Sequence, residues 1–367
     1  MVEKKGDKDW IFWITIVVSF VLIEHNSAEP LFILALVIIP FLALLFYYKK
    51  SFYPLILYLL TIGILGRIDQ YHSSTYGSDA LPAIRDFIGY FVHGKNVYKE
   101  MIMAQSGLTP FTYLPFSLFW YLPAYIFNID LRFFEMLVSS LVPILILIYG
   151  RVLKTIKILP FFAVVSLTPF LIDLSADGSN DNSTIFILLL SIILFVYSIK
   201  NKSRFFAIAS AIILGFAASF KHHVFFYLLF FFPYIYQNKD LLPISNSRYI
   251  FYTLLTILIV SGPFILLTPQ GFFRSLSFIE ITNWHNTWGW NIWVAFRDSM
   301  YISFSTGQMW LVRTAISLIT VILLFRYFRL DSFNKVFATS GVTMFIYLVF
   351  SQWTTHAYFT YLIPLLS

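Results

Sequence analysis

The chain has 367 residues, of which 59% are hydrophobic and only 12% are charged, and its formal net charge is +7. A soluble protein of this length carries about twice that density of charge. The long apolar stretches, such as residues 31–48 and 249–268, are continuous and lack the alternation of a membrane β-barrel strand. The basic residues form small clusters at the ends of apolar runs, which argues against nucleic-acid binding. The absence of cysteine excludes disulfides, thiolate catalysis and zinc-thiolate sites.

The apolar runs predict an all-α fold, a polytopic transmembrane helix bundle of about 11–12 spans. At roughly 20 residues each, twelve spans would use about two thirds of the chain. The first run follows Lys4 and Lys5 and would also suit a cleaved signal peptide. The predicted spans begin at Trp10, Leu31, Phe52, Phe133, Ile158, Ser183, Phe205, Val224, Tyr249, Met309, Val336 and Trp353.

Basic residues predict the orientation of this bundle, because short cytoplasmic loops are enriched in Lys and Arg. The clusters fall on one side only if residues 111–128 do not cross the membrane. Pro110, Pro115 and Pro123 weaken a straight span there, so we expect an outer interfacial helical loop. The clusters placed in the cytoplasm are Lys4/Lys5/Lys8, Lys49/Lys50, Arg151/Lys154/Lys157, Lys200/Lys202/Arg204, Lys239/Arg248 and Arg326/Arg329/Lys335.

This topology predicts a single transmembrane domain over residues 1–367, with outer segments at 67–132, 173–182 and 269–308. The first outer segment contains Asp79 directly after a Gly-Ser pair and shortly after a span. A carboxylate at the membrane boundary could act as a general base towards a lipid-linked substrate. The alternative is a solvated loop, which is the better interpretation for most of its neighbours.

The second outer segment concentrates the carboxylates Asp173, Asp177 and Asp181. Their mutual repulsion calls for solvent, a cation or a hydrogen-bonding substrate. An ordinary Asp/Asn/Gly turn between two helices explains the same pattern, with Asn182 or Ser183 as the helix cap.

A basic triplet, Lys221-His222-His223, lies between two apolar runs with almost no loop around it. The predicted topology puts it at the outer boundary, where a lysine suggests a lipid phosphate as its partner. Snorkelling of Lys221 to the headgroups is the alternative. A zinc site is disfavoured, because adjacent histidines point in different directions on a helix.

The third outer segment interleaves tryptophans with Asn and His, which is typical of a sugar-binding surface and also of a membrane-interface belt. His356, further along, returns to the same face. The substrate-binding candidates, together with Asp177 and Asp181, are Trp284, His285, Trp288, Arg297 and His356.

The order Gly77-Ser-Asp79, Gly94-Lys-Asn-Val-Tyr98 and Phe111-Thr-Tyr113-Leu-Pro115 resembles the first outer loop of C-type (GT-C) integral membrane glycosyltransferases. The polyprenyl-phosphate-mannose-dependent alpha-mannosyltransferase branch is the most similar. Lys221 and the segment from His356 to Pro364 are similar to later motifs of that branch. Val97 and Leu114 stand where the branch usually has proline, and residues 177–180 replace an expected Gly-Gln, so the sugar stays open.

The resemblance implies an enzyme that moves a sugar, a hexose such as mannose, from a polyprenyl-phosphate donor to a glycan, lipid or protein acceptor. The reaction would take place on the extracytoplasmic face of the cell membrane, with inversion. Asp79 would be the catalytic base, and Lys221 with His222 would bind the donor phosphate. Some relatives use a divalent metal and others do not, so the metal stays open.

Two other functions fit the same sequence. A lipid-linked glycan transporter or flippase predicts charges near the bilayer midplane and a repeated helix pattern. Apart from Lys221, Arg313 is the only basic residue that looks buried in a span, and the sequence shows no internal repeat. A polysaccharide polymerase would instead use Arg274, Arg297 and His285.

Overall fold

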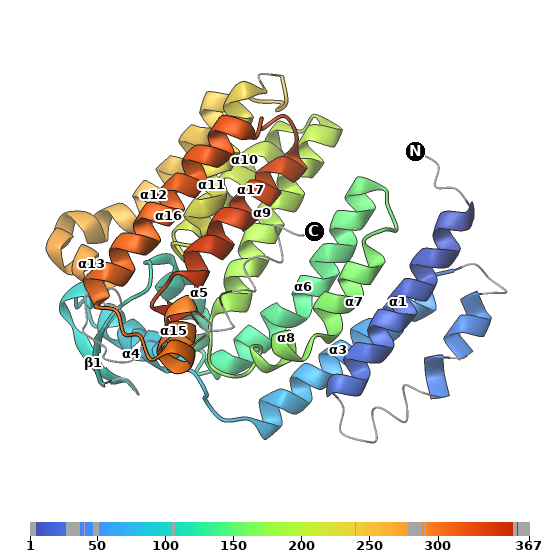
Figure 1. The fold of residues 1–367 in the computed structure, drawn as a ribbon, viewed down its shortest axis with the longest axis horizontal. Coiled ribbons are helices and arrows are strands. Elements are labelled where there is room, and N and C mark those ends of the chain that lie inside the picture. The colour runs from blue at the N-terminus through green and yellow to red at the C-terminus, as the bar shows by residue number, and fades with distance from the viewer. Residues whose placement is uncertain are drawn as a thin grey trace. The chain divides into compact units, whose positions relative to one another are not determined.

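The computed structural model describes residues 5–26, 37–39, 41–46, 51–104, 107–238, 240–277, 288–289, 291–354 and 358. Helices make up most of this part of the chain, and its two small sheets have two strands each (Figure 1). The predicted all-α fold is therefore confirmed.

The chain packs as two compact units. The first unit is built from Met1–Ser78 and Asp130–Phe186. Within it, α3 packs against α6, α7 and α8, and α1 packs against α7. Its helices are α1 (Lys5–Asn26), α3 (Tyr53–Ser73), α6 (Leu131–Leu153), α7 (Leu159–Leu167), α8 (Pro169–Asp173) and the start of α9 (Asp181–Asn201).

The second unit is built from Asp79–Ile129 and Ile187–Leu366. Its helix pairs are α10 with α12, α11 with α17, and α16 with α17. In addition to the rest of α9, it contains α4 (Ala80–Val92), η1 (Val97–Lys99), β1 (Met101–Ala104), β2 (Gly107–Pro110), α5 (Phe116–Ile126), α10 (Arg204–Ala218), α11 (Val224–Gln237), α12 (Asn246–Leu267), α13 (Pro269–Leu276), β3 (Trp288–Gly289), α15 (Ile292–Met300), α16 (Thr306–Tyr327), α17 (Phe333–Val349) and β4 (Trp353–Thr354).

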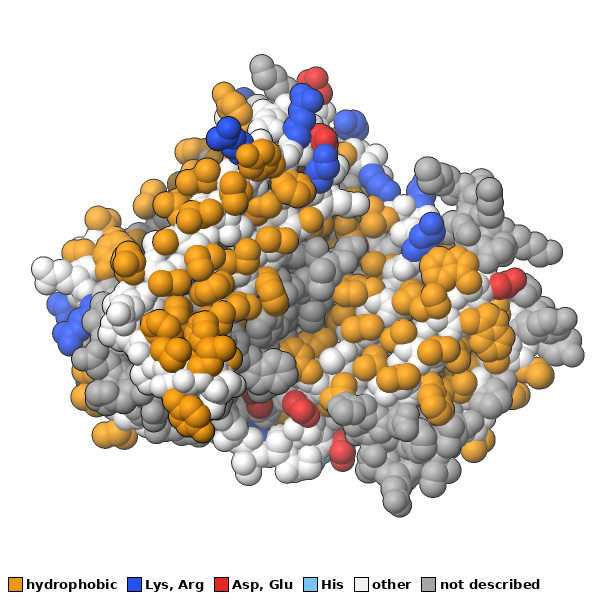
Figure 2. All heavy atoms as spheres, in the orientation of Figure 1, with side chains coloured by type: hydrophobic (Ala, Val, Ile, Leu, Met, Phe, Trp, Pro, Cys, Tyr) orange, Lys and Arg blue, Asp and Glu red, His pale blue; other side chains and the backbone are white. Residues whose placement is uncertain are grey.

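Four of the described helices, α6, α9, α12 and α16, are long and apolar enough to cross a bilayer. Other apolar helices, such as α10, α11 and α17, have 15, 14 and 17 residues and are shorter than a typical span. Figure 2 shows apolar side chains spread over α12 and α16, with Lys and Arg gathered at one end of this helical layer. The protein is thus a helical membrane protein, and the total of about 11–12 spans stays a prediction.

The span predicted from Ile158 is interrupted. Helix α7 has nine residues, and Pro169 starts α8 directly after Thr168. Thr168 has φ −59° and ψ 123°, an extended conformation, because the ring of a following proline disfavours the helical one. The apolar run therefore forms two short helices in place of one straight span.

Arg67 marks the predicted start of an outer segment, but α3 continues to Ser73 and buries Arg67. Its guanidinium donates to the carbonyl oxygens of Val165 and Ser166 at 3.1 and 2.8 Å, and to Ser139 Oγ at 2.9 Å. The last carbonyls of a helix have no partner within the helix. Arg67 satisfies two of these at the end of α7, which fixes α3 against the break at Pro169.

Residues 111–128 contain the 11-residue helix α5, which begins after Pro115 and includes Pro123. At 1.5 Å per residue it is about 16 Å long, roughly half of a hydrocarbon core. A length of this kind agrees with an element that does not cross the membrane.

The last predicted span does not begin as a helix. Trp353–Thr354 forms strand β4, which pairs in parallel with β3. The backbones approach so closely that a Cβ atom on Gly289 would clash with the Thr354 carbonyl oxygen, and Gly289 has φ +95°. Glycine is the residue that permits both features. Pairing with a distant strand thus determines the structure here, and most of the chain after Thr354 lies outside the described residues.

Candidate functional site

A buried basic residue, Lys221, lies in the turn between α10 and α11, with 7% of its surface exposed. The turn begins where α10 ends, and the Lys221 N–H donates to the Ala217 carbonyl oxygen at 3.3 Å. The Lys221 Nζ atom lies over the ring of Tyr358, 5.6 Å from its centre. Contact of an ammonium group with an aromatic face is worth about 2 kcal/mol when water is excluded.

Arg313, on α16, is the second buried basic residue of this region, with 5% exposed. Its guanidinium carbon lies 4.8 Å from the centre of the Tyr347 ring, and Nη1 donates to Ser351 Oγ at 3.4 Å. The His223 ring links the two residues, because it lies 5.1 Å from the Tyr358 ring and 6.4 Å from the Tyr347 ring. We call Lys221, His222, His223 and Arg313 the basic cluster.

His222 is exposed at the surface, and the protein packed around its inner side reduces its contact with water. Burial, followed by the positive charges of Lys221 and Arg313, lowers the pKa of His222 to about 4. The same cause, followed by the charges of His222 and Lys221, lowers the pKa of His223. Both rings are therefore neutral near pH 7, and the positive charge of the basic cluster resides on Lys221 and Arg313.

Asp79 occupies the position before α4, half-buried, and its carbonyl oxygen accepts from the Ala83 N–H at 2.9 Å. Its carboxylate makes no capping hydrogen bond to the helix that follows. A base for an acceptor hydroxyl must have its oxygen atoms available to that hydroxyl. The geometry at α4 is thus compatible with the predicted role, which stays a prediction.

Helix α5 packs against α4 and also contacts the turn of Lys221. The Phe116 N–H at its start donates to the Ser219 carbonyl oxygen at 2.9 Å, two residues before Lys221. Its far end lies beside the start of α4, where Arg85 donates to Asn128 Oδ1 at 3.2 Å. The turn of Lys221 therefore lies at the start of α5, and Arg85 of α4 lies beside its end.

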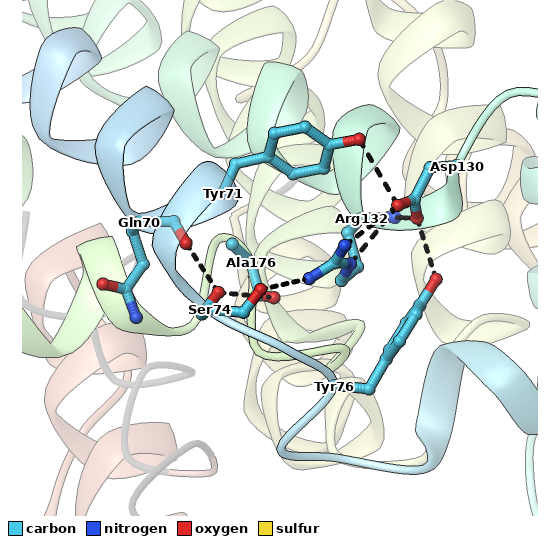
Figure 3. Close-up of polar contacts among 7 residues, drawn as sticks. All are labelled: Gln70, Tyr71, Ser74, Tyr76, Asp130, Arg132 and Ala176. Carbon is cyan, nitrogen blue, oxygen red and sulfur yellow. Dashed lines mark hydrogen bonds and ion pairs between the residues drawn. The ribbon is translucent and has the colours of Figure 1, made fainter.

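Residues 74–78, directly before Asp79, are held by a polar clamp in the first unit (Figure 3). Asp130 caps α6, accepting from the Arg132 N–H at 2.9 Å, and its carboxylate also accepts from Tyr76 Oη at 2.8 Å. Figure 3 shows the Arg132 guanidinium beside the Tyr76 ring, where it donates to Asp130 and, at 2.8 Å, to the Ser74 carbonyl oxygen. No pattern in the sequence indicates this clamp, because its two halves are far apart along the chain.

The clamp keeps its charges near pH 7. Burial by itself would raise the pKa of Asp130, but hydrogen bonds from Tyr76 and Arg132 and the charge of Arg132 outweigh it and hold the pKa below its ordinary value. Burial, followed by the hydrogen bond to Asp130 and its negative charge, raises the pKa of Tyr76 to about 12. Asp130 is therefore ionised and Tyr76 keeps the proton that it donates.

The acidic segment 173–182 contacts the same residues from another side. The Asp177 carbonyl oxygen accepts from the N–H groups of Gly77 and Ser78 at 2.8 and 2.7 Å. Gly178 has φ +94°, and a Cβ atom there would lie 2.6 Å from the Ser78 carbonyl oxygen, so this approach requires glycine. Two segments that the sequence singled out separately are thus joined through their backbones.

Within this segment the carboxylates differ in their surroundings. Asp173 is exposed, Asp181 is buried, and Asp177 is half-buried with Oδ1 accepting from the Ser179 N–H at 2.7 Å. Burial, only partly offset by the hydrogen bonds from Ser179 and increased by the charges of Asp181 and Asp173, raises the pKa of Asp177 to about 6. Among the residues that the structure describes, no group of three or more His, Cys, Asp or Glu side chains could hold a metal ion.

The remaining predicted site residues are less informative. Arg297 forms an exposed ion pair with its neighbour Asp298 at 2.7 Å. Trp288 is described only as part of β3, and Trp284, His285 and His356 lie outside the described residues. Arg313, Tyr347 and Tyr358 belong to the surroundings of Lys221 in the structure. The phosphate site predicted from the sequence contains Lys221 and His222 only.

Comparison with known proteins adds no relative. No family model matches the sequence, and neither a curated protein nor a solved structure matches the chain.

Proposed function

We propose that the protein is a membrane glycosyltransferase that moves a sugar from a polyprenyl-phosphate donor to an acceptor hydroxyl on the extracytoplasmic face. The observation behind this proposal is the basic cluster, which concentrates two buried cations beside tyrosine rings. Lysine and arginine side chains are the ones that proteins use to bind phosphate groups. The family resemblance gives such a phosphate its chemical class, a polyprenyl-phosphate sugar.

In the proposed reaction the Asp79 carboxylate accepts the proton of the acceptor hydroxyl. The acceptor oxygen forms a bond to the anomeric carbon while the bond from that carbon to the phosphate oxygen breaks, with inversion. The electron pair of the broken bond stays on the phosphate, where Lys221 and Arg313 stabilise the charge.

The test measures sugar transfer from a polyprenyl-phosphate sugar by variants at equal membrane abundance. We expect Lys221→Ala to lose about 3 kcal/mol of transition-state stabilisation, roughly a hundredfold in rate, by the effect of removing one charge-stabilising donor. Lys221→Arg should keep part of the rate, because the charge survives with a different geometry. Asp79→Asn should abolish transfer while the protein remains folded.

The matched control is Arg204→Ala, which removes an exposed cation at the opposite end of α10 and should leave the rate unchanged. Undiminished turnover in Lys221→Ala would remove the basic cluster from the site. If Lys221→Arg equalled the wild type and Lys221→Ala lost only abundance, Lys221 would be an anchor to the headgroups. Full activity of Asp79→Asn would point to another base or to the polymerase mechanism.

A further inference from the structure

The second unit contains a β-hairpin, formed by β1 and β2, whose outer face is apolar. In the antiparallel register Met103 lies opposite Leu108, and Ile102 lies opposite Thr109. Opposed residues share a face of the sheet and successive residues alternate. Met101, Met103 and Leu108 therefore form one face and are 39%, 78% and 56% exposed, whereas Ile102 on the other face is 7% exposed. We call these three residues the hairpin face.

The inner side of the hairpin is anchored to its unit, so the hairpin face has a defined direction. Strand β1 packs against α4, and β2 packs against η1. Tyr98 in η1 is buried, with its hydroxyl donating to the Tyr113 carbonyl oxygen at 2.7 Å and its ring 4.8 Å from that of Phe272 on α13. The packing of the inner side therefore leaves the hairpin face pointing away from the second unit.

Backbone hydrogen bonding limits the depth that this hairpin can reach in a membrane. The sheet has two strands among the described residues, so each strand has one edge whose N–H and C=O groups are not bonded within the sheet. In the hydrocarbon core each such group would cost several kcal/mol, but at headgroup depth water and lipid headgroups satisfy it. The hairpin face thus fits the interfacial layer of a bilayer and not its centre.

Exposed cations lie in the elements next to the hairpin, and the carboxylate Glu100 directly precedes β1. Lys99 precedes β1 by two residues, and Lys95 lies on the Tyr90 ring with Nζ 4.9 Å from its centre. Arg274 is exposed on α13, which packs against η1. Figure 2 shows basic side chains beside apolar ones over α13, at the edge of the unit that also contains β1. Lys and Arg beside apolar residues favour anionic headgroups, at about 1 kcal/mol for each cation near the surface.

We propose that the hairpin face binds a lipid surface, with Met101, Met103 and Leu108 in the interfacial layer and Lys95, Lys99 and Arg274 against anionic headgroups. This inference does not depend on the proposed transferase activity. It gives the second unit a peripheral contact with the bilayer in addition to its helices.

The test places a fluorescent probe on the hairpin in the full-length protein, which has no cysteine of its own. Met103→Cys is labelled with an environment-sensitive maleimide and reconstituted in nanodiscs of phosphatidylcholine, alone or mixed with phosphatidylglycerol. Quenching by lipid-bound nitroxide is compared with quenching by aqueous iodide. Thr109→Cys, on the opposite face of the same hairpin, is the matched control, and a monodisperse elution profile confirms the fold of each variant.

We expect the Met103 probe to show a blue-shifted emission, strong quenching by nitroxide lipid and weak quenching by iodide. Phosphatidylglycerol should increase its quenching by nitroxide lipid. The Thr109 probe should be quenched less by nitroxide lipid than the Met103 probe. Dominant quenching by iodide would show a water-exposed face and overturn the proposal. Protection from both quenchers would show that protein covers the face and would overturn it equally.

A second variant tests the charges separately. Lys95→Glu combined with Lys99→Glu should remove the gain in nitroxide quenching caused by phosphatidylglycerol and leave the quenching in pure phosphatidylcholine. If the gain caused by phosphatidylglycerol survives in this variant, the assignment of these lysines to anionic headgroups is wrong.

Discussion

Asp130 and Asp177 show at the residue scale how surroundings determine the charge of a carboxylate. Arg132 and Tyr76 hold the pKa of Asp130 below its ordinary value, so its contribution to stability is present above that ordinary value and is lost as the pH falls through the folded-state pKa. Asp177 has a raised pKa, so its effect has the opposite sign. In the folded chain it binds a proton more tightly than in the unfolded chain, and stability falls as the pH rises from 3.8 through about 6.

We therefore predict that Asp177→Asn flattens the pH dependence of unfolding within that window and raises the melting temperature above it relative to the wild type. The physical reason is that an amide in this position has no proton to lose. Thermal unfolding in detergent, followed by tryptophan fluorescence at pH values on both sides of the window, measures the effect. Asp173→Asn, which alters an exposed carboxylate of the same segment, should leave the pH profile nearly unchanged. An unaltered profile in Asp177→Asn would contradict the prediction.

At the scale of elements, the start of α9 is held by a buried carboxylate from α6. Glu135 Oε1 accepts from the Ser183 N–H at 2.9 Å, and Oε2 accepts from Ser183 Oγ. The first N–H groups of a helix have no partner within the helix and carry partial positive charge. The Glu135 carboxylate satisfies one of these N–H groups. The partial positive charge of the helix end stabilises the negative charge of Glu135, although this residue is fully buried.

Removing this carboxylate should destabilise the contact between α6 and α9. We expect Glu135→Ala to lower the free energy of unfolding by about 3 kcal/mol, because a buried N–H and a hydroxyl lose a charged acceptor. Glu135→Gln keeps one acceptor oxygen and should lose less. Unfolding in mixed detergent micelles measures both, with the exposed Arg151→Ala at the other end of α6 as the control. Equal stability of Glu135→Ala and wild type would show that the contact is not formed.

For the whole molecule, the distribution of basic residues predicts which ends of the helices face the cytoplasm. Arg132 and the residues before Asp79 belong to the predicted outer side, and the cluster at Lys200, Lys202 and Arg204 belongs to the inner side. The described structure contains four helices that are long and apolar enough to cross a bilayer, but orientation itself is a property of the protein in its membrane.

Single cysteines decide the orientation, because the chain contains none. Thr75→Cys should react with a membrane-impermeant maleimide added to intact cells, and Lys202→Cys should react only after the cells are permeabilised. Both positions are exposed in the structure, so a failure to react cannot come from burial within the protein. Labelling of Thr75→Cys from the cytoplasmic side alone would reverse the topology and exclude an extracytoplasmic site at Asp79.

The sequence by itself determined the class of the protein and the positions of most helices. Continuous apolar runs bounded by charges report locally on burial in lipid, so the helices from α9 to α12 and the short element α5 follow from them. The apolar runs predicted the wrong structure at two places. Pro169 divides one predicted span into two short helices, and pairing with β3 makes the segment that begins with Trp353 a strand.

Tertiary structure alone decided which charged residues meet. Arg313 shares its surroundings with Lys221, Arg132 holds the backbone of Ser74, and Asp177 binds the N–H groups that precede Asp79, although each pair is far apart in sequence. Hydropathy specifies that a helix is buried but not which helix lies beside it. A charge in a medium of low dielectric constant needs a partner, and the packing of the helices determines which partner it finds.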